Sequence, residues 1–240
     1  MALPHFILSD ARLPLTEEPR PGSDAAAGLT SFGPRGPLRS IPEQIADFLL
    51  ENYIARATSS YPIFYEPWLR SAYASVFQDA PNISRGNGSN INEPKVYDTF
   101  VICLVMAVSL SSTASTKQAQ ANSMASKLCK QAISHIKQVL TDDFAGIQAL
   151  VLLHTYAIMN PAVANVYFLA GYIMQACMDQ GLHRETSIAD SIDRTDLLVQ
   201  DMRRRVFWTA WELDASCSAG FARPVALRPE DISTVFPSDF

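Results

Sequence analysis

The sequence has few of the residues that metal clusters and disulfide scaffolds require. Among 240 residues there are only four cysteines, and no two of them form a CxxC pair. Small zinc modules usually carry such close ligand pairs, and small disulfide-stabilised domains are dense in cysteine. We therefore interpret the four thiols as small buried apolar groups in a reducing compartment. They are Cys103, Cys129, Cys177 and Cys217.

Positive charge is also scarce. Lysine and arginine number 19 against 24 acidic residues, giving a net charge of −5, and the only dense basic run is Arg203–Arg205. Proteins that bind nucleic acid unaided usually present a basic face to the phosphates. Direct DNA binding by this chain is therefore not expected.

Export and membrane signals are missing from the sequence as well. The first ten residues contain no basic n-region, and the longest apolar run, 100–110, is shorter than the ~20 residues that span a bilayer. A soluble, intracellular protein without membrane association is predicted.

The proline pattern divides the chain. Residues 1–40 hold six prolines and no sustained periodicity, so we expect a flexible leader there, followed by one helical domain over 41–240. Ser40 and Glu43 have the spacing of a capping box. A polar segment, 79–94, is expected to be an exposed loop, and the prolines after residue 220 favour an extended C-terminal tail.

Apolar periodicity predicts an all-α fold. The pattern favours helices over 42–56, 67–77, 101–111, 119–140, 144–159, 163–180 and 196–218, with short connections typical of antiparallel neighbours. In the first helix Ile45, Phe48, Leu49 and Tyr53 share one face. Gly181 fits a helix C-cap.

No motif indicates catalysis or a bound cofactor. The sequence has no HExxH zinc motif, GxSxG elbow, phosphate loop or dinucleotide fingerprint. His154 is interpreted as a hydrogen-bonded core residue, and Asp142–Asp143 as an acidic first helical turn rather than a magnesium site. No catalytic residue, metal site or cofactor is therefore predicted, and the chain is not expected to be an enzyme.

The most informative segment is the predicted helix 196–218. Met202, Val206, Ala210, Leu213 and Cys217 form an apolar stripe that Trp208, Trp211 and Ala215 widen. Asp201 and Arg205 have the spacing of a helical ion pair, and Arg204 has the spacing to lie along Trp208. The arginine triplet could be a phosphate or nuclear-import patch, but a solvated, salt-bridged rim is favoured.

The segment from residue 202 to 239, MRRRVFWTAWELDASCSAGFARPVALRPEDISTVFPSD, resembles the signature of the fungal-specific transcription factor domain. This domain is the middle homology region of zinc binuclear-cluster regulators. Two further segments are similar to the family, YFLAGYIMQACMDQGLHRE at 167–185 and YPIFYEPWLRSAY at 61–73. The signature residues are Arg204, Arg205, Phe207, Trp208, Trp211, Asp214, Arg223 and Pro224, and the helix-end motif is Gly181, Leu182, His183 and Arg184.

The chain departs from the family pattern at several places. Ala222 stands where the family usually has glycine, Tyr65 where histidine is common, and Val235 where proline is common. The six-cysteine cluster that holds two zinc ions is absent. The helices that normally follow the signature are missing too, so the resemblance implies the front portion of a regulatory domain, truncated at its C-terminal end.

The resemblance implies a nuclear regulator of transcription, of a fungal metabolic or secondary-metabolite gene cluster. Its partners would be a full-length zinc-cluster regulator or another transcription protein, with the signature lining an effector groove for a small molecule. Two alternatives stay open. One is an enzyme or small-molecule carrier with an apolar pocket among Trp208, Trp211, Tyr167 and His154. The other is a nonfunctional fragment.

Overall fold

The computed structural model describes residues 36–77, 96–113, 117–185 and 194–238, and every regular element in these ranges is a helix. The all-α prediction is thereby confirmed for the described part of the chain. The expected leader up to residue 35 and the expected loop 79–94 lie outside these ranges. The elements are η1 (Leu38–Ser40), α1 (Glu43–Ser60), α2 (Glu66–Phe77), α3 (Val96–Ser112), α4 (Gln118–Ser134), α5 (Ile136–Val139), α6 (Phe144–Met159), α7 (Val166–Asp179), α8 (Arg194–Gly220) and η2 (Pro229–Asp231).

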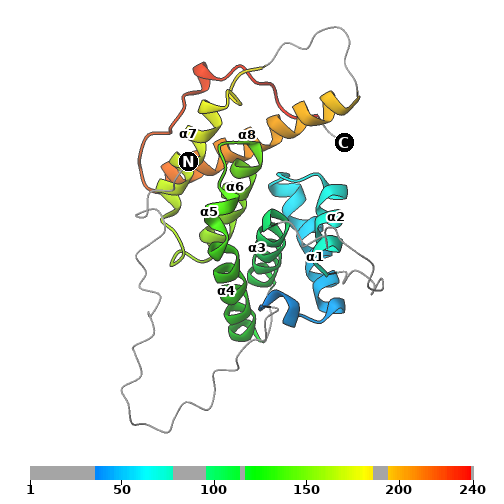
Figure 1. Ribbon diagram of the computed structural model, residues 1–240. Coiled ribbons are helices and arrows are strands. Elements are labelled where there is room, and N and C mark those ends of the chain that lie inside the picture. The colour runs from blue at the N-terminus through cyan, green and yellow to red at the C-terminus, as the bar shows by residue number, and fades with distance from the viewer. Residues whose placement is uncertain (1–35, 78–95, 114–116, 186–193, 239–240) are drawn as a thin grey trace.

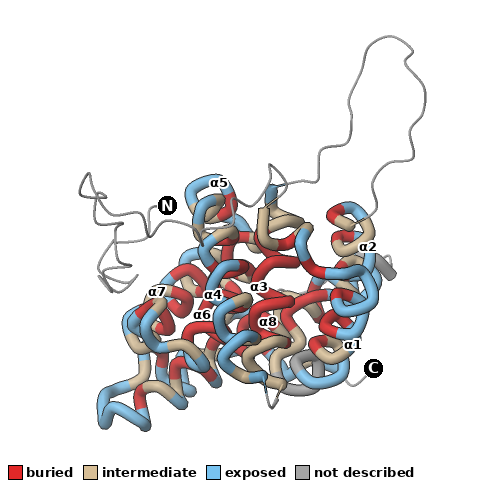
Figure 2. The backbone as a smooth tube through the Cα atoms, turned by 90° about the horizontal axis from the view of Figure 1, so that it is seen from below, coloured by how far each residue is buried: buried red, intermediate tan, exposed pale blue. Residues whose placement is uncertain are grey.

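Helix α3 forms the centre of the array. It contacts α1, α2, α4, α5 and α6, and its residues from Phe100 to Ser109 are all buried. A helix that is apolar on all sides needs neighbours on all sides, which this arrangement provides. Figure 2 shows the buried residues gathered in α3, α6 and α8, with the exposed residues on the outer turns.

Helices α6 and α7 form the layer that supports α8, and side chains cap both of them. The Asp143 carboxylate accepts a hydrogen bond from Gly146 N, and the Asn165 amide oxygen accepts one from Phe168 N. Capping satisfies backbone donors that a helix start leaves unpaired. Asp143 is therefore the N-cap of α6 and Asp142 precedes it, so the acidic pair lies just before the first helical turn and not within it, where the sequence predicts it.

Helix α8 contacts α7 and α6, and Figure 1 shows it crossing one end of the array. The residues after it run back beside α8 and α7, coloured red in Figure 1, and contain η2 as their only regular element within the described range. We call residues 221–238 the tail. Its extended form agrees with the prediction from its prolines, but it is packed against the helices over much of its length.

Residues just before the expected domain start at residue 41 already pack against the helices. Leu38 lies in η1, is 1% exposed, and donates its backbone N–H to Gln131 Oε1 at 3.1 Å. The capping box at Ser40 is wrong in form, because the Ser40 hydroxyl donates to Pro37 O at 2.6 Å. Packing begins before residue 40 because Leu38 has a place in the core.

The predicted apolar face of α1 is displaced by about one position. Ile45 and Phe48 are 49% and 57% exposed, whereas Ala46 and Leu50 are buried with the predicted Leu49 and Tyr53. Both sets have helical spacing, so periodicity alone does not distinguish them. Contact with α3 selects the second set.

The predicted helix 119–140 is two helices in the structure. Helix α4 ends at Ser134, and His135 N bonds to Ala132 O and Ile133 O in place of the regular helical acceptor. Helix α5 then runs for a single turn from Ile136 to Val139. This break turns the chain towards α6.

Candidate functional site

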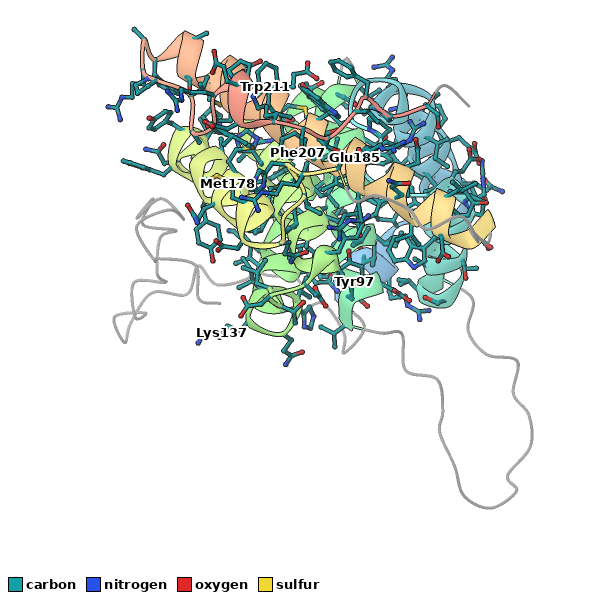
Figure 3. The ribbon with its side chains drawn as sticks, turned by 90° about the horizontal axis from the view of Figure 1, so that it is seen from above. Tyr97, Lys137, Met178, Glu185, Phe207 and Trp211 are labelled. Carbon is teal, nitrogen blue, oxygen red and sulfur yellow. The ribbon has the colours of Figure 1, made fainter. Side chains whose placement is uncertain are left out.

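The signature residues gather where α8 meets the tail and the end of α7. Side chains from α8 bond to the tail along much of its length, and we call these contacts the clamp. Figure 3 labels Glu185, which follows α7, and Phe207 and Trp211, which lie on α8. Phe207 is fully buried and anchors α8 in the core beneath the clamp.

Glu185, just after α7, joins α8 to the tail. Arg204 donates to its carboxylate at 2.6 and 3.3 Å, and Gln200 donates to the same group. From the tail, Val235 N donates at 3.0 Å and the Thr234 hydroxyl at 3.2 Å. The hydrogen bond from Arg204, more than any other contact, holds the pKa of Glu185 below its ordinary value. The Glu185 carboxylate, which follows α7, therefore bonds both to α8 and to the tail.

Asp201 forms a second contact between α8 and the tail. On α8 it lies four residues before Arg205. It accepts Ser238 N at 2.8 Å, the Ser238 hydroxyl at 2.7 Å and Arg205 Nε at 2.5 Å, and it is 3% exposed. Arg205 also donates to Ser238 O at 2.5 Å. Burial raises the pKa of Asp201, but the bonds from Ser238 and Arg205 outweigh burial, so its pKa lies below the ordinary value. The predicted Asp201–Arg205 pair is confirmed.

An aromatic contact lies between the Glu185 and Asp201 contacts with the tail. The Trp208 indole N–H donates to Val235 O at 2.9 Å, and its ring stacks on Phe236 with centroids 4.2 Å apart and planes at 20°. Trp211 packs edge-on against Trp208 at 5.7 Å. Offset stacking adds stability beyond the area that it buries. Trp208 thus fixes the tail through both its polar and its apolar side.

The beginning of the tail is held at the end of α8. Asp214, 2% exposed, accepts Ala226 N at 2.8 Å, and the Ser218 hydroxyl donates to Pro224 O at 3.2 Å. The Arg223 guanidinium lies 4.7 Å from the centroid of the Tyr167 ring on α7. Burial raises the pKa of Asp214, opposed by the bond from Ala226.

Two helix ends shape the clamp through the same backbone motif. At the end of α7, Leu182 N bonds to Cys177 O and Gly181 N to Met178 O, with Gly181 at φ +64°. At the end of α8, Arg223 N bonds to Ser218 O and Ala222 N to Ala219 O, with Ala222 at φ +51°. Both patterns are Schellman ends, in which the left-handed residue is usually glycine.

The motif at 181–184 contributes mainly through its backbone. His183 O accepts Ser233 N at 3.0 Å and Thr234 N at 3.1 Å. The His183 imidazole accepts a hydrogen bond from Arg184 Nε at 3.1 Å. Leu182 is 2% exposed and packs into the core. The tail is thus held by the His183 carbonyl after α7 and by side chains of α8.

All three arginines of the triplet bond to protein groups. Arg203 donates to Gln180 O at 3.3 Å, Arg204 pairs with Glu185, and Arg205 pairs with Asp201. The expected stacking of Arg204 along Trp208 is replaced by its bonds to Glu185. All three arginines are half-buried and bonded, which favours the salt-bridged rim over a phosphate patch. The sequence did not single out Glu185 or Ser238 as functional residues.

The Cys217 thiol lies close to the His154 imidazole, but the geometry of the pair does not activate the thiol. His154 is fully buried, and its Nε2 lies 2.9 Å from Val166 O and 3.8 Å from Cys217 Sγ. Since a carbonyl only accepts, Nε2 carries the proton and does not act as a base towards Cys217. Burial, and then the charge of Asp214, raises the pKa of Cys217. The prediction that His154 is a hydrogen-bonded core residue is confirmed.

Within the described residues, no three histidine, cysteine or acidic side chains are grouped in a way that could hold a metal ion. None of the described helices is both long and apolar enough to cross a membrane. A described cavity lies between the start of α6 and the end of α7, and its lining does not include Trp208, Trp211, Tyr167 or His154.

Comparison with known proteins identifies relatives of one kind. The model of the fungal-specific transcription factor domain matches residues 50–240. Pyrimidine pathway regulatory protein 1 of Saccharomyces cerevisiae is 31% identical over 99 residues, covering 41% of this chain and 10% of the relative. The positive regulator of purine utilization of Emericella nidulans is 28% identical over 140 residues, covering 45% of this chain and 13% of the relative. The C6 finger domain transcription factor hasF of Aspergillus fumigatus is 30% identical over 97 residues, covering 40% and 13%.

The match is thus to a limited part of longer proteins. The chain spans between 10% and 13% of the length of these three curated relatives. No solved structure matches the chain. The names of the family and of the relatives are those of transcription regulators rather than of enzymes.

Proposed function

The chain belongs to the fungal-specific transcription factor domain family, and from this premise we propose that it regulates transcription in a fungal nucleus. The observation that carries the proposal is the family match over residues 50–240, which includes every residue of the clamp. The relatives are named as regulators of pyrimidine and purine pathways, which supports a metabolic or secondary-metabolite gene set as the target.

The helical array would act as a regulatory domain rather than as the DNA contact. The chain has no six-cysteine cluster, its net charge is −5, and its arginine triplet is occupied by protein partners. A net acidic protein whose densest basic run is engaged in internal bonds gains little from counterion release on DNA. We therefore propose that it reaches promoters through a full-length zinc-cluster regulator or another transcription protein, without a cofactor and without catalysis of its own.

The clamp gives this proposal a mechanism. A regulatory domain needs an element with two arrangements whose balance a ligand or partner shifts. The tail is suited to this role because polar bonds and one exposed stacked ring hold much of it, with few apolar anchors such as Leu227. Opening the clamp would expose the α8 face that Val235 and Phe236 cover.

Tethering the chain to a promoter tests the function. We would fuse it to a heterologous sequence-specific DNA-binding domain and measure a reporter gene in yeast. The expected result is a several-fold change in reporter expression relative to the DNA-binding domain alone. The Glu185→Gln fusion should alter this change, whereas Arg70→Gln, on an exposed pair remote from the clamp, should not.

A negative result has a clear meaning in this design. If the fusion is folded, nuclear and bound at the promoter, and the reporter still equals that of the DNA-binding domain alone, the proposal fails. A second measurement concerns the DNA contact. Tight binding of duplex DNA by the purified chain at physiological salt would contradict the proposed need for a partner.

A further inference from the structure

Residues 233–238 of the tail are held by the helices in the way that a bound peptide is held. We call them the docked segment, and they form neither a helix nor a strand. Binding of an extended peptide through its main chain gives affinity that depends little on its sequence. The main-chain bonds of the docked segment are Ser233 N and Thr234 N to His183 O, Val235 N to Glu185, Trp208 Nε1 to Val235 O, Ser238 N to Asp201, and Arg205 to Ser238 O.

Alternate side chains of the docked segment add a sequence preference. The Thr234 hydroxyl donates to the Glu185 carboxylate at 3.2 Å. The Phe236 ring stacks on Trp208, and the Ser238 hydroxyl donates to a carboxylate of α8 at 2.7 Å. Every second side chain of an extended segment faces the same side. The site therefore selects a hydroxyl, an aromatic ring and a second hydroxyl, each two residues apart.

The groups that hold the docked segment are positioned by contacts that do not involve it. Arg204 pairs with Glu185 at 2.6 Å, and Arg205 pairs with Asp201 at 2.5 Å. The Trp208 ring also packs edge-on against two aromatic neighbours on α8. The site is therefore built into the helical array, and a preformed site costs little to order around a ligand.

The docked segment fills this site incompletely. Phe236 is 72% exposed and Val235 is 50% exposed. Earlier in the tail Leu227 is buried in the core, so the rest of the tail can stay in place when the docked segment leaves. A segment that buries more apolar surface on Trp208 would bind more tightly, because the hydrophobic contribution grows with the buried area.

We infer that this site binds an extended segment of a partner protein, and that the docked segment is a tethered competitor for it. The partner segment carries a serine or threonine, an aromatic residue two positions later, and a second serine or threonine two positions after that. The inference rests on the proposed function and deepens it, since it states the chemistry by which the chain recognises another transcription protein.

The tail of a second copy is at a disadvantage in the same site. It would make the same bonds as the chain's own docked segment but without the tether, which provides an effective concentration of about 1 mM. A partner segment can offset the tether by burying more of the Trp208 ring than Phe236 does. The structure therefore favours a partner over self-association.

Fluorescence anisotropy on the full chain tests the inference, with a fluorescein-labelled peptide of residues 232–240 as the probe. The receptor is the chain with Phe236→Ala and Ser238→Ala, both at exposed positions, so that its own tail competes poorly. A tail that is mostly closed at about 1 mM effective concentration requires a peptide Kd below about 100 µM. The wild type should bind the peptide at least about tenfold more weakly than this tail variant, because its tethered segment competes.

Matched changes locate the binding. Trp208→Phe, added to the tail variant, keeps a ring for stacking but removes the indole N–H. It should weaken the peptide about three- to tenfold, the usual effect of one hydrogen bond. Trp68→Phe is the same change on α2, where the ring packs against Phe64 and Tyr97, and it should leave binding unchanged. The Phe236→Ala peptide should bind about tenfold more weakly than the parent peptide.

Several results would overturn the inference. They are no binding at millimolar peptide, equal binding of a scrambled peptide, and equal affinity of the wild type and the tail variant. A measurement on the wild type alone does not depend on any variant. Saturating labelled peptide should speed amide hydrogen exchange of residues 233–238, and unchanged exchange would contradict displacement. A concentration-dependent dimer that the tail variant loses would put a second copy in the site in place of a partner.

Failure of this inference and failure of the proposed function are distinguishable. Peptide binding is measured on purified protein, without a promoter or reporter. If binding fails while the tethered chain still changes reporter expression, only the peptide site is lost. If binding succeeds while the reporter does not respond, the regulatory role is lost and a peptide-binding domain remains.

Discussion

At the scale of single residues, the structure explains one departure from the family pattern. Ala222 occupies the left-handed position of the Schellman end of α8, at φ +51°. An L-residue pays roughly 1–2 kcal/mol in this conformation, whereas glycine does not. The glycine that the family usually has at this position is therefore explained by backbone conformation alone.

Replacing Ala222 by glycine should stabilise the protein. We expect Ala222→Gly to raise the free energy of unfolding by about 0.5–1 kcal/mol, since relief of strain exceeds the added entropy of the unfolded chain. Ala219→Gly, in the ordinary helical turn just before it, should lower the free energy of unfolding by up to about 1 kcal/mol. Chemical denaturation of both variants measures the two effects, and the same sign for both would contradict the assignment.

His154 should make the protein sensitive to mild acid. Burial lowers its pKa from 6.5 to about 4, although the bond to Val166 O opposes this. Between these values the unfolded state binds a proton that the folded state does not, so stability falls as the pH drops from 6.5 towards 4. The loss amounts to about 3 kcal/mol in this window.

The measurement compares urea denaturation of the wild type and His154→Gln across this pH range. Glutamine can still donate to Val166 O but does not titrate, so the stability difference between the two proteins should shift towards the variant as the pH falls. Parallel pH profiles would show that His154 is protonated as readily in the folded protein as in the unfolded chain.

At the scale of elements, two helical glycines should respond in opposite ways to alanine. A Cβ at Gly146 in α6 would meet Thr141 O at 2.1 Å, whereas a Cβ at Gly171 in α7 would meet nothing within 4 Å. Gly171→Ala should therefore stabilise by about 0.5–1 kcal/mol, the usual gain in helix propensity. Gly146→Ala should destabilise by about 1–3 kcal/mol, in the range of an overpacked site.

Thermal denaturation of the two alanine variants measures this contrast. Stabilisation by both substitutions would mean that Thr141 moves away at little cost. In that case the close approach of Thr141 to α6 is less firmly held than its geometry indicates.

Most elements could be predicted from the sequence because their signals are local. The helix over 144–159 agrees with the structure at both ends, since Asp143 begins it and Asn160–Pro161 follows it. The displaced face of α1 and the break between α4 and α5 depend on contacts with α3, which periodicity does not contain. The clamp could not be predicted from the sequence for the same reason, because Glu185 and Val235 are 50 residues apart in the chain.

At the scale of the whole molecule, the signature acts as one structural unit. Phe207 anchors α8 in the core, and on the surface Arg204, Trp208 and Asp214 hold successive parts of the tail through Glu185, Val235 and Ala226. The resemblance located these residues, and the structure shows what they contact. These residues fix the tail on α8, and we propose that regulation depends on this closed arrangement.

Amide hydrogen exchange followed by mass spectrometry measures whether the tail is held on α8. The amides of Ser233, Thr234, Val235 and Ser238 donate to His183 O, Glu185 and Asp201. They should exchange well below the unstructured rate in the wild type, and much faster in Glu185→Gln, while α3 stays protected in both. Tail amides that exchange at the unstructured rate in the wild type would contradict the clamp.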